Sequence, residues 1–186
     1  MNIQRLQGLA TLLLLSLPCL SHAVDCQITL SQSVVDYHQM RRENIIATQQ
    51  NWNKMPERDI DVSLYCPEKQ QMAALLQGAA GEKGRFVFGN NGGVAIKVSN
   101  MTMDGKSYNI GKTTDRLNFS AQGDTGSSLF IKNNELLFAI ENGASPTGQQ
   151  MNFKVTIFPV LNENAFSHIS DETTLESDLS WEIVNH

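Results

Sequence analysis

Two cysteines, each lying in a short run that alternates between apolar and polar residues, constrain the fold of this chain most. The first run is Cys26–Leu30 and the second is Asp59–Cys66. In each run the cysteine shares a strand face with the aliphatic residues, which are Ile28, Leu30, Ile60, Val62 and Leu64. Two strands that bury these faces in one sandwich can bring the sulfurs together as a disulfide. The alternative is two reduced core cysteines, which are typical of cytosolic proteins.

The N-terminus favours the disulfide, because it has the features of a secretory signal peptide. A basic start at Arg5 is followed by an apolar run from Leu9 to Leu20, and a small-residue motif ends at Ala23. The apolar run is too short to favour a transmembrane helix. We therefore expect cleavage between Ala23 and Val24.

This cleavage divides the chain into a signal peptide, residues 1–23, and one mature domain, residues 24–186, which is long enough to bury a core. Cys19 leaves with the signal peptide, so the exported chain keeps an even number of cysteines. In an oxidising compartment we expect Cys26 and Cys66 to be bonded to each other.

The charge of the chain argues against a nucleic-acid partner. The formal net charge is −5, and Arg41-Arg42 is the only pair of adjacent basic residues. A nucleic-acid-binding surface needs a basic patch or stripe. We expect no nucleic acid among the partners.

Short alternating runs separated by Gly, Asn and Asp recur along the mature chain and indicate strands. Pro67 is expected to end the strand before it, and Asp104-Gly105 is expected to form a type I′ hairpin turn. Residues 38–58 are polar apart from Ile45-Ile46 and Trp52, residues 141–150 have a loop-like composition, and residues 162–174 form a polar link. The expected strands cover 26–30, 33–37, 59–66, 72–78, 85–88, 94–98, 108–110, one or two within 128–140, 151–157 and 175–183. Together they predict an all-β sandwich in a single domain.

No sequence motif indicates a catalysed reaction. Asp124-Thr125-Gly126 matches the aspartic-protease string, but that chemistry needs a second carboxylate of the same kind, and the string occurs once. Gly111-Lys112-Thr113 lacks the upstream glycine spacing of a phosphate loop. The histidines at 38, 168 and 186 have no ligand-like spacing. We expect no enzyme activity, no catalytic residue, no metal site and no cofactor.

The order of these features resembles the chaperone–usher pilins, the fimbrial subunits of Gram-negative bacteria. The likeness rests on Cys26 near the mature N-terminus, Cys66 at a strand end, the Asp104-Gly105 hairpin, the strand at 151–158 and the alternating strand that ends in Trp181-Glu182-Ile183-Val184. The family implies an immunoglobulin-like β-sandwich that is incomplete, because it lacks its last strand. It also implies three partners: a periplasmic pilus chaperone, an outer-membrane usher and a neighbouring pilin subunit that donates the missing strand.

Four apolar residues of the C-terminal run share one strand face and would line the groove that accepts the donated strand. They are Leu175, Leu179, Trp181 and Ile183. A sandwich short of one strand exposes apolar side chains and unpaired backbone groups, which favour the addition of a strand. The alternative is that these residues belong to the core of a complete sandwich.

The predicted cleavage site departs from polymerising pilins, which carry a donor segment before the first strand. Only Val24-Asp25 would precede Cys26. We expect such a subunit to accept a strand and not to donate one, as do minor subunits at a fimbrial tip, with a role in cell adhesion through a host receptor. The chain would be exported through the periplasm to the fimbrium at the cell surface. The alternatives are a secreted or periplasmic binding module with a complete sandwich, and a small secreted hydrolase.

Overall fold

A computed structural model of the chain describes residues 25–39, 47–49, 51–166 and 174–186. The expected signal peptide, residues 1–23, and the cleavage site between Ala23 and Val24 lie outside these residues. The described elements, in chain order, are β1 Gln27–Leu30, β2 Ala47–Gln49, β3 Trp52–Lys54, β4 Arg58–Gly78, the 3₁₀ turn η2 Glu82–Gly84, β5 Phe86–Phe88, β6 Gly92–Met103, β7 Lys106–Ser107, β8 Asn109–Thr113, β9 Ser128–Ile131, β10 Glu135–Ile140, β11 Thr147–Asn162, the 3₁₀ turn η3 Glu163–Phe166 and β12 Leu179–Asn185.

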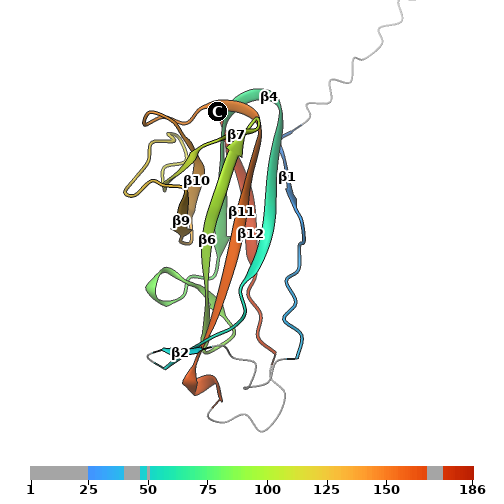
Figure 1. The fold of residues 1–186 in the computed structure, drawn as a ribbon, viewed down its shortest axis with the longest axis vertical. Helices are drawn as coiled ribbons and strands as arrows, with labels where there is room; N and C mark the ends of the chain where they lie inside the picture. The colour runs from blue at the N-terminus through green and yellow to red at the C-terminus, as the bar shows by residue number, and fades with distance from the viewer. Residues whose placement is uncertain (1–24, 40–46, 50, 167–173) are drawn as a thin grey trace, which may run out of the picture.

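The strands form two antiparallel sheets that share the long strand β4, which bends at one end of the molecule (Figure 1). The first sheet has the order β1, the first half of β4, β11 and β6, and β5, β7 and β9 pair with β6. The second sheet has the order β12, the second half of β4, β10 and β8. The all-β sandwich predicted from the sequence is confirmed.

The strand order is that of an immunoglobulin-like sandwich. In chain order, β1, the two halves of β4, β6, β11 and β12 correspond to strands A, B, C, D, E and F. The first sheet then has the order A-B-E-D, and C and F pair in the second sheet. The seventh strand of such a domain, G, would pair with F. Within the described residues, β12 pairs with β4 alone.

The passage of β4 between the two sheets corrects one expectation. We expected Pro67 to end a strand, but β4 continues through it to Gly78. The pairing of β11 with β4 skips from Tyr65 to Gln70, so the position of Pro67 needs no backbone N–H for the ladder. A proline is tolerated in a strand where pairing is interrupted.

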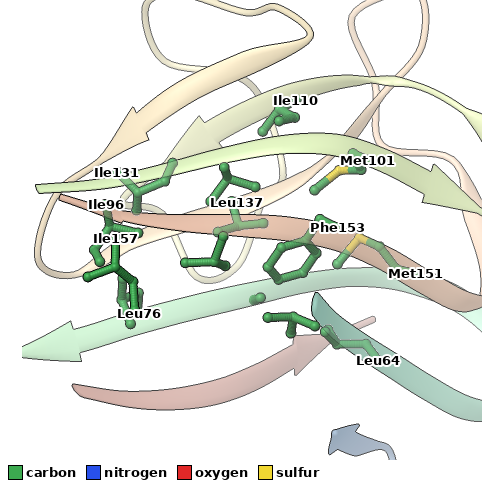
Figure 2. Close-up of a cluster of buried hydrophobic side chains, with 14 of the residues drawn as sticks. Leu64, Leu76, Ile96, Met101, Ile110, Ile131, Leu137, Met151, Phe153 and Ile157 are labelled. Atoms are coloured by element: carbon green, nitrogen blue, oxygen red, sulfur yellow. The ribbon is translucent and has the colours of Figure 1, made fainter. Parts of the chain in front are cut away.

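The main core lies between the two sheets. Alternate residues of β4, β6 and β11 face it from the first sheet, and residues of β4, β8 and β10 face it from the second. Figure 2 shows Phe153 and Ile157 of β11 close to Leu137 of β10 and Leu76 of β4. These four side chains are at most 9% exposed.

A second, smaller cluster buries the outer face of the second sheet. Phe119, from the loop between β8 and β9, covers Leu75 of β4 and Phe138 of β10. The rings of Phe119 and Phe138 are stacked with centroids 5.7 Å apart, and the His186 ring lies 4.9 Å from that of Phe119. The second half of β4 is therefore buried on both faces, which explains why 72–76 is a continuous apolar run.

Several expected elements differ from those observed. Residues 33–37 form no strand, and β2 and β3 lie in the polar region 38–58, for which no strand was predicted. Strand β11 begins at Thr147, inside the loop expected at 141–150. The Asp104-Gly105 hairpin is confirmed, with both residues at positive φ between the paired Met103 and Lys106. Two strands, β9 and β10, occupy the 128–140 region, and they belong to different sheets.

Candidate functional site

The side of the sandwich bounded by β1 and β12 is the candidate site, and we call it the open side. Within the described residues, β1 and β12 each pair with β4 alone, and the two strands contact each other. Each strand therefore has one edge whose backbone N–H and C=O groups have no partner strand. Such an edge favours pairing with an added strand.

The first rim of the open side consists of residues 26–37. Ser31 continues the line of β1, because its backbone N–H donates to the carbonyl oxygen of Asp61 at 2.9 Å. After Ser31 the first rim no longer pairs with β4. Apolar side chains before and after this point nevertheless pack against the main core. These half-buried side chains are Cys26, Ile28, Leu30, Val35 and Tyr37.

The second rim consists of residues 175–185. In β12 the side chains of Leu179, Trp181 and Ile183 pack against the core, whereas Ser180 and Glu182 point outward and are exposed. No residue of β12 is fully buried. By contrast, the residues of β4 opposite β12, from Met72 to Leu76, are 0% exposed.

Leu175 was expected to belong to the C-terminal strand, but β12 begins at Leu179, so this expectation is wrong. Leu175 nevertheless packs against the main core, over Gly89 at the end of β5. The backbone N–H of Gly89 donates to the carbonyl oxygen of Glu176 at 3.0 Å. The chain around Leu175 and Glu176 is therefore held at Gly89, directly after β5.

One end of the open side carries the expected disulfide, Cys26–Cys66, and we call it the disulfide end. The side chain of Gln70 joins the two rims there. Its Nε2 donates to Sγ of Cys26 at 3.0 Å, and its Oε1 accepts from Nδ2 of Asn185 at 2.9 Å. The backbones of Gln71 and His186 exchange hydrogen bonds of 3.0 and 3.1 Å beside it.

At the opposite end, which we call the far end, Tyr37 of the first rim is the notable polar group. The guanidinium carbon of Arg58 lies 5.4 Å from the centre of its ring. Its hydroxyl oxygen is buried and has no hydrogen-bond partner among the described residues. Burial raises the pKa of this hydroxyl to about 12, with the nearby Arg58 acting in the opposite direction. The group is therefore a neutral O–H donor at any physiological pH.

The other residues that were considered for catalysis or metal binding lie apart from the open side or on the surface. Asp124 of the protease-like string is exposed in the loop before β9. His38 lies beside Asp36, Nδ1 to Oδ2 at 3.0 Å, with both side chains largely exposed. Among the described residues, no group of three or more potential metal ligands comes together.

Of the expected groove residues, the structure brings Leu179, Trp181 and Ile183 onto one core-facing side of β12, with Leu175 beyond its start. Sequence reasoning missed Gln70 and Tyr37. A glutamine in a polar stretch carries no local signal of a bridge, and Tyr37 was read only as part of an extended run. Val35 and Tyr37 alternate with exposed neighbours as strand residues would, but this pattern does not indicate that the Tyr37 hydroxyl is enclosed.

Comparisons with known proteins found similarity to solved structures and none to family models or curated sequences. No protein-family model matches the chain, and no curated protein matches it in sequence. Among solved structures, the chain is similar to the P pilus rod subunit PapA, with 13% sequence identity and a TM-score of 0.38, over 87% of this chain and 99% of that one. Within the described residues, no helix is long and apolar enough to cross a membrane.

Proposed function

We propose that this chain is a fimbrial subunit of the chaperone–usher type, whose sandwich is completed by a strand donated from another protein. The donated strand would pair with β12 in the position of the seventh strand. Its apolar side chains would cover the half-buried side chains of both rims. This proposal assigns the expected acceptor role to Leu179, Trp181 and Ile183, with Leu175 at the far end.

The observation that carries the proposal is the incomplete burial of β12. The strand alternates as a core strand does, yet every core-facing residue on it is only half-buried. In a seven-stranded sandwich strand F lies between C and G and has partners on both edges. Partly exposed apolar side chains and unpaired backbone groups at this position cost free energy in water. The uncovered strand and its free edge lie on the same side of the molecule.

The proposed partners are a periplasmic pilus chaperone, an outer-membrane usher and a neighbouring subunit. The chaperone would occupy the open side before assembly and the neighbouring subunit would occupy it afterwards. The expected signal peptide, residues 1–23, would export the chain, and its final location would be the fimbrium at the cell surface.

Within this proposal the chain is a minor subunit at the fimbrial tip with a role in cell adhesion. The tip position follows from the expected cleavage between Ala23 and Val24, which would leave too short a lead to serve as a donor strand. N-terminal sequencing of the exported protein tests the cleavage site. Immunogold labelling of fibres tests the tip position, and host-cell attachment by a strain lacking the chain tests adhesion.

The central experiment is expression of the full chain in the bacterial periplasm with and without its pilus chaperone. We expect a soluble one-to-one complex with the chaperone, and aggregation or degradation in its absence. A stable, soluble monomer without chaperone would contradict the proposal and favour a complete binding module. The matched comparison is a chaperone variant whose donated strand carries aspartate at its apolar positions, which should fail to rescue the chain.

A further inference from the structure

The outer face of the first sheet holds a hollow of about 400 Å³ that the proposed strand addition does not use. Residues of β1, β4, β6 and β11 line it. Across its middle, Thr29, Ser63 and Asn152 lie opposite one another in the register of β1, β4 and β11. Their neighbours along each strand pack into the core, so these three side chains face outward. Because Thr29 and Ser63 are short, they form the floor of the hollow.

Asp61 adds a carboxylate that has no partner. The register of β4 and β11 places Lys154 directly opposite Asp61. The Nζ of Lys154 nevertheless lies 3.3 Å from Oδ2 of Asp59. Among the described residues, the side chain of Asp61 forms no hydrogen bond or ion pair, and the same is true of the Thr29 and Ser63 hydroxyls. The hollow therefore presents one free carboxylate and two free hydroxyl groups.

A β-bulge adds the side chain of Asn100. The register of β6 against β11 passes from Thr102 opposite Asn152 to Ser99 opposite Lys154, so β6 carries one extra residue there. Asn100 has φ of +55°, is exposed and lines the hollow. Asparagine is one of the residues that tolerate positive φ, and bulges commonly re-aim a side chain beside a functional site. Within the part of the chain that the structure describes, its amide has no hydrogen-bond partner.

These groups restrict the class of ligand. At the hollow, β4 and β11 each have partner strands on both edges, so the main chain offers no edge to an added strand. The free carboxylate of Asp61, beside a lysine that is already paired, disfavours an anion. Carboxylate, hydroxyl and amide groups match a neutral ligand rich in hydroxyl groups. Tyr65, the next outward residue of β4 after Ser63, is 47% exposed and offers an aromatic face beside them.

We propose that this hollow binds a neutral saccharide, a mono- or disaccharide unit of a larger glycan, and that Asp61 accepts hydrogen bonds from its hydroxyl groups. The volume of the hollow lies within the range of small-molecule sites. The inference rests on the proposed adhesion role and names the chemical class of the receptor. A strand donated at the open side and a glycan bound here would occupy different faces of the domain.

The test uses the full exported chain in complex with its pilus chaperone. The probe is an array of immobilised neutral, sialylated and sulfated glycans, and the neutral glycan that binds most strongly is then titrated in solution. We expect binding to neutral glycans. Binding to no glycan, or to the sialylated and sulfated glycans alone, would overturn the inference.

Two substitutions test the position of the site. Asp61→Asn keeps the size of the side chain and removes its charge, and we expect it to weaken glycan binding about tenfold. Ser63→Leu fills the floor of the hollow and should abolish binding. The controls Asp124→Asn and Ser107→Leu make the same changes at exposed positions elsewhere and should bind as the wild type does.

Chaperone co-purification should be the same for all four variants, because each changes an outward-facing side chain. Glycan binding that is unchanged in Asp61→Asn and Ser63→Leu, or reduced equally in the controls, would overturn the inference. If the chain forms the chaperone complex and binds no glycan, this inference fails alone. If no complex forms, the proposed strand addition fails, and the same glycan assay on the soluble chain still decides whether the hollow binds a saccharide.

Discussion

Trp181 of β12 lies against Phe153 of β11 across the core, with the ring centroids 5.7 Å apart and the ring planes inclined at 54°. The pair joins the second sheet to the first at the open side. Phe153 is 3% exposed, whereas Trp181 is only half-buried. The chain therefore encloses Phe153 fully and leaves part of Trp181 exposed.

This relationship makes Trp181→Asp a direct test of the open side. The variant removes the contact with Phe153 and places a carboxylate against the core, which should destabilise the fold by roughly 3 kcal/mol. We expect a marked fall in periplasmic yield and in chaperone co-purification. Ser180→Asp is the matched control, since Ser180 is the exposed neighbour on the opposite face of β12. Equal yields for the two variants would argue against an acceptor role for Trp181.

The disulfide gives a second prediction. Replacing Cys26 and Cys66 together by alanine removes a cross-link between residues 40 positions apart. In the chain-entropy description this lowers the free energy of unfolding by about 4 kcal/mol. Urea unfolding of the chaperone-bound or peptide-bound protein measures the loss, and reduced wild type should behave like the double variant. Free thiols in the denatured, unreduced wild type would contradict the bond.

Phe119 provides a third prediction, because it covers the outer face of the second sheet. Phe119→Ala uncovers Leu75 and Phe138 and should lower the free energy of unfolding by about 3 kcal/mol. Leu117→Ala is the control from the same loop, since Leu117 is 84% exposed and should change stability little. Similar losses of free energy of unfolding in the two variants would show that Phe119 contributes no more to stability than an exposed residue of the same loop.

A fourth prediction concerns the contact between Gly89 and Leu175. Gly89 has φ of +56°, and a Cβ added there would overlap the Leu175 side chain. Gly89→Ala should therefore destabilise the chain more than Gly123→Ala, which has φ of +83° but open space around it. Adding Leu175→Ala should recover part of the loss at Gly89 and none at Gly123. If the stability effects of the glycine substitution and of Leu175→Ala simply add at both glycines, Leu175 does not lie over Gly89.

The fifth prediction is a pH dependence on the outer face of the first sheet. The Thr156 hydroxyl donates to Asp59 at 2.8 Å, and Lys154 lies 3.3 Å from the same carboxylate. The hydrogen bond from Thr156, followed by the interactions with Lys154, lowers the pKa of Asp59. A carboxyl with a lowered folded-state pKa favours folding above its unfolded pKa of about 3.9, and this contribution is lost as the pH falls through the folded-state pKa.

Thr156→Val should raise the pKa of Asp59 toward its ordinary value, as measured by NMR titration of the carboxyl carbon. The stability difference between wild type and Thr156→Val should be larger at neutral pH than below the folded-state pKa. In an Asp59→Asn background this pH dependence should disappear. If the pH dependence persists in the Asp59→Asn background, another ionisable group causes it.

The elements that sequence predicts well are those whose signal is local. The alternation around Cys26 and Cys66 and along 179–183 is visible in a few residues, because each strand places one face in the core. The hairpin at Asp104-Gly105 is equally local, since it depends on two residues that tolerate positive φ.

The elements that sequence missed depend on distant partners. Thr147–Gln150 has a loop-like composition, yet the Asp104 carboxylate accepts the backbone N–H groups of Gln149 and Gln150 at 3.0 and 2.9 Å and holds them in β11. Phe119 lies in a polar loop and is buried only because the second sheet passes beneath it. In the candidate site, the apolar face of β12 was predictable, whereas the roles of Gln70 and Tyr37 arise from segments that meet only in the folded chain.

The bridge made by Gln70 has a mechanical consequence. Because one side chain joins Cys26 to Asn185, the spacing between the rims is fixed at the disulfide end, and both rims are anchored to the same strand, β4. At the far end no comparable bridge between the rims exists among the described residues. There the rims are held separately, by the hydrogen bond from Ser31 to Asp61 of β4 and by the hydrogen bond from Gly89 to Glu176, so their spacing depends on the packing of the core and not on a shared polar side chain.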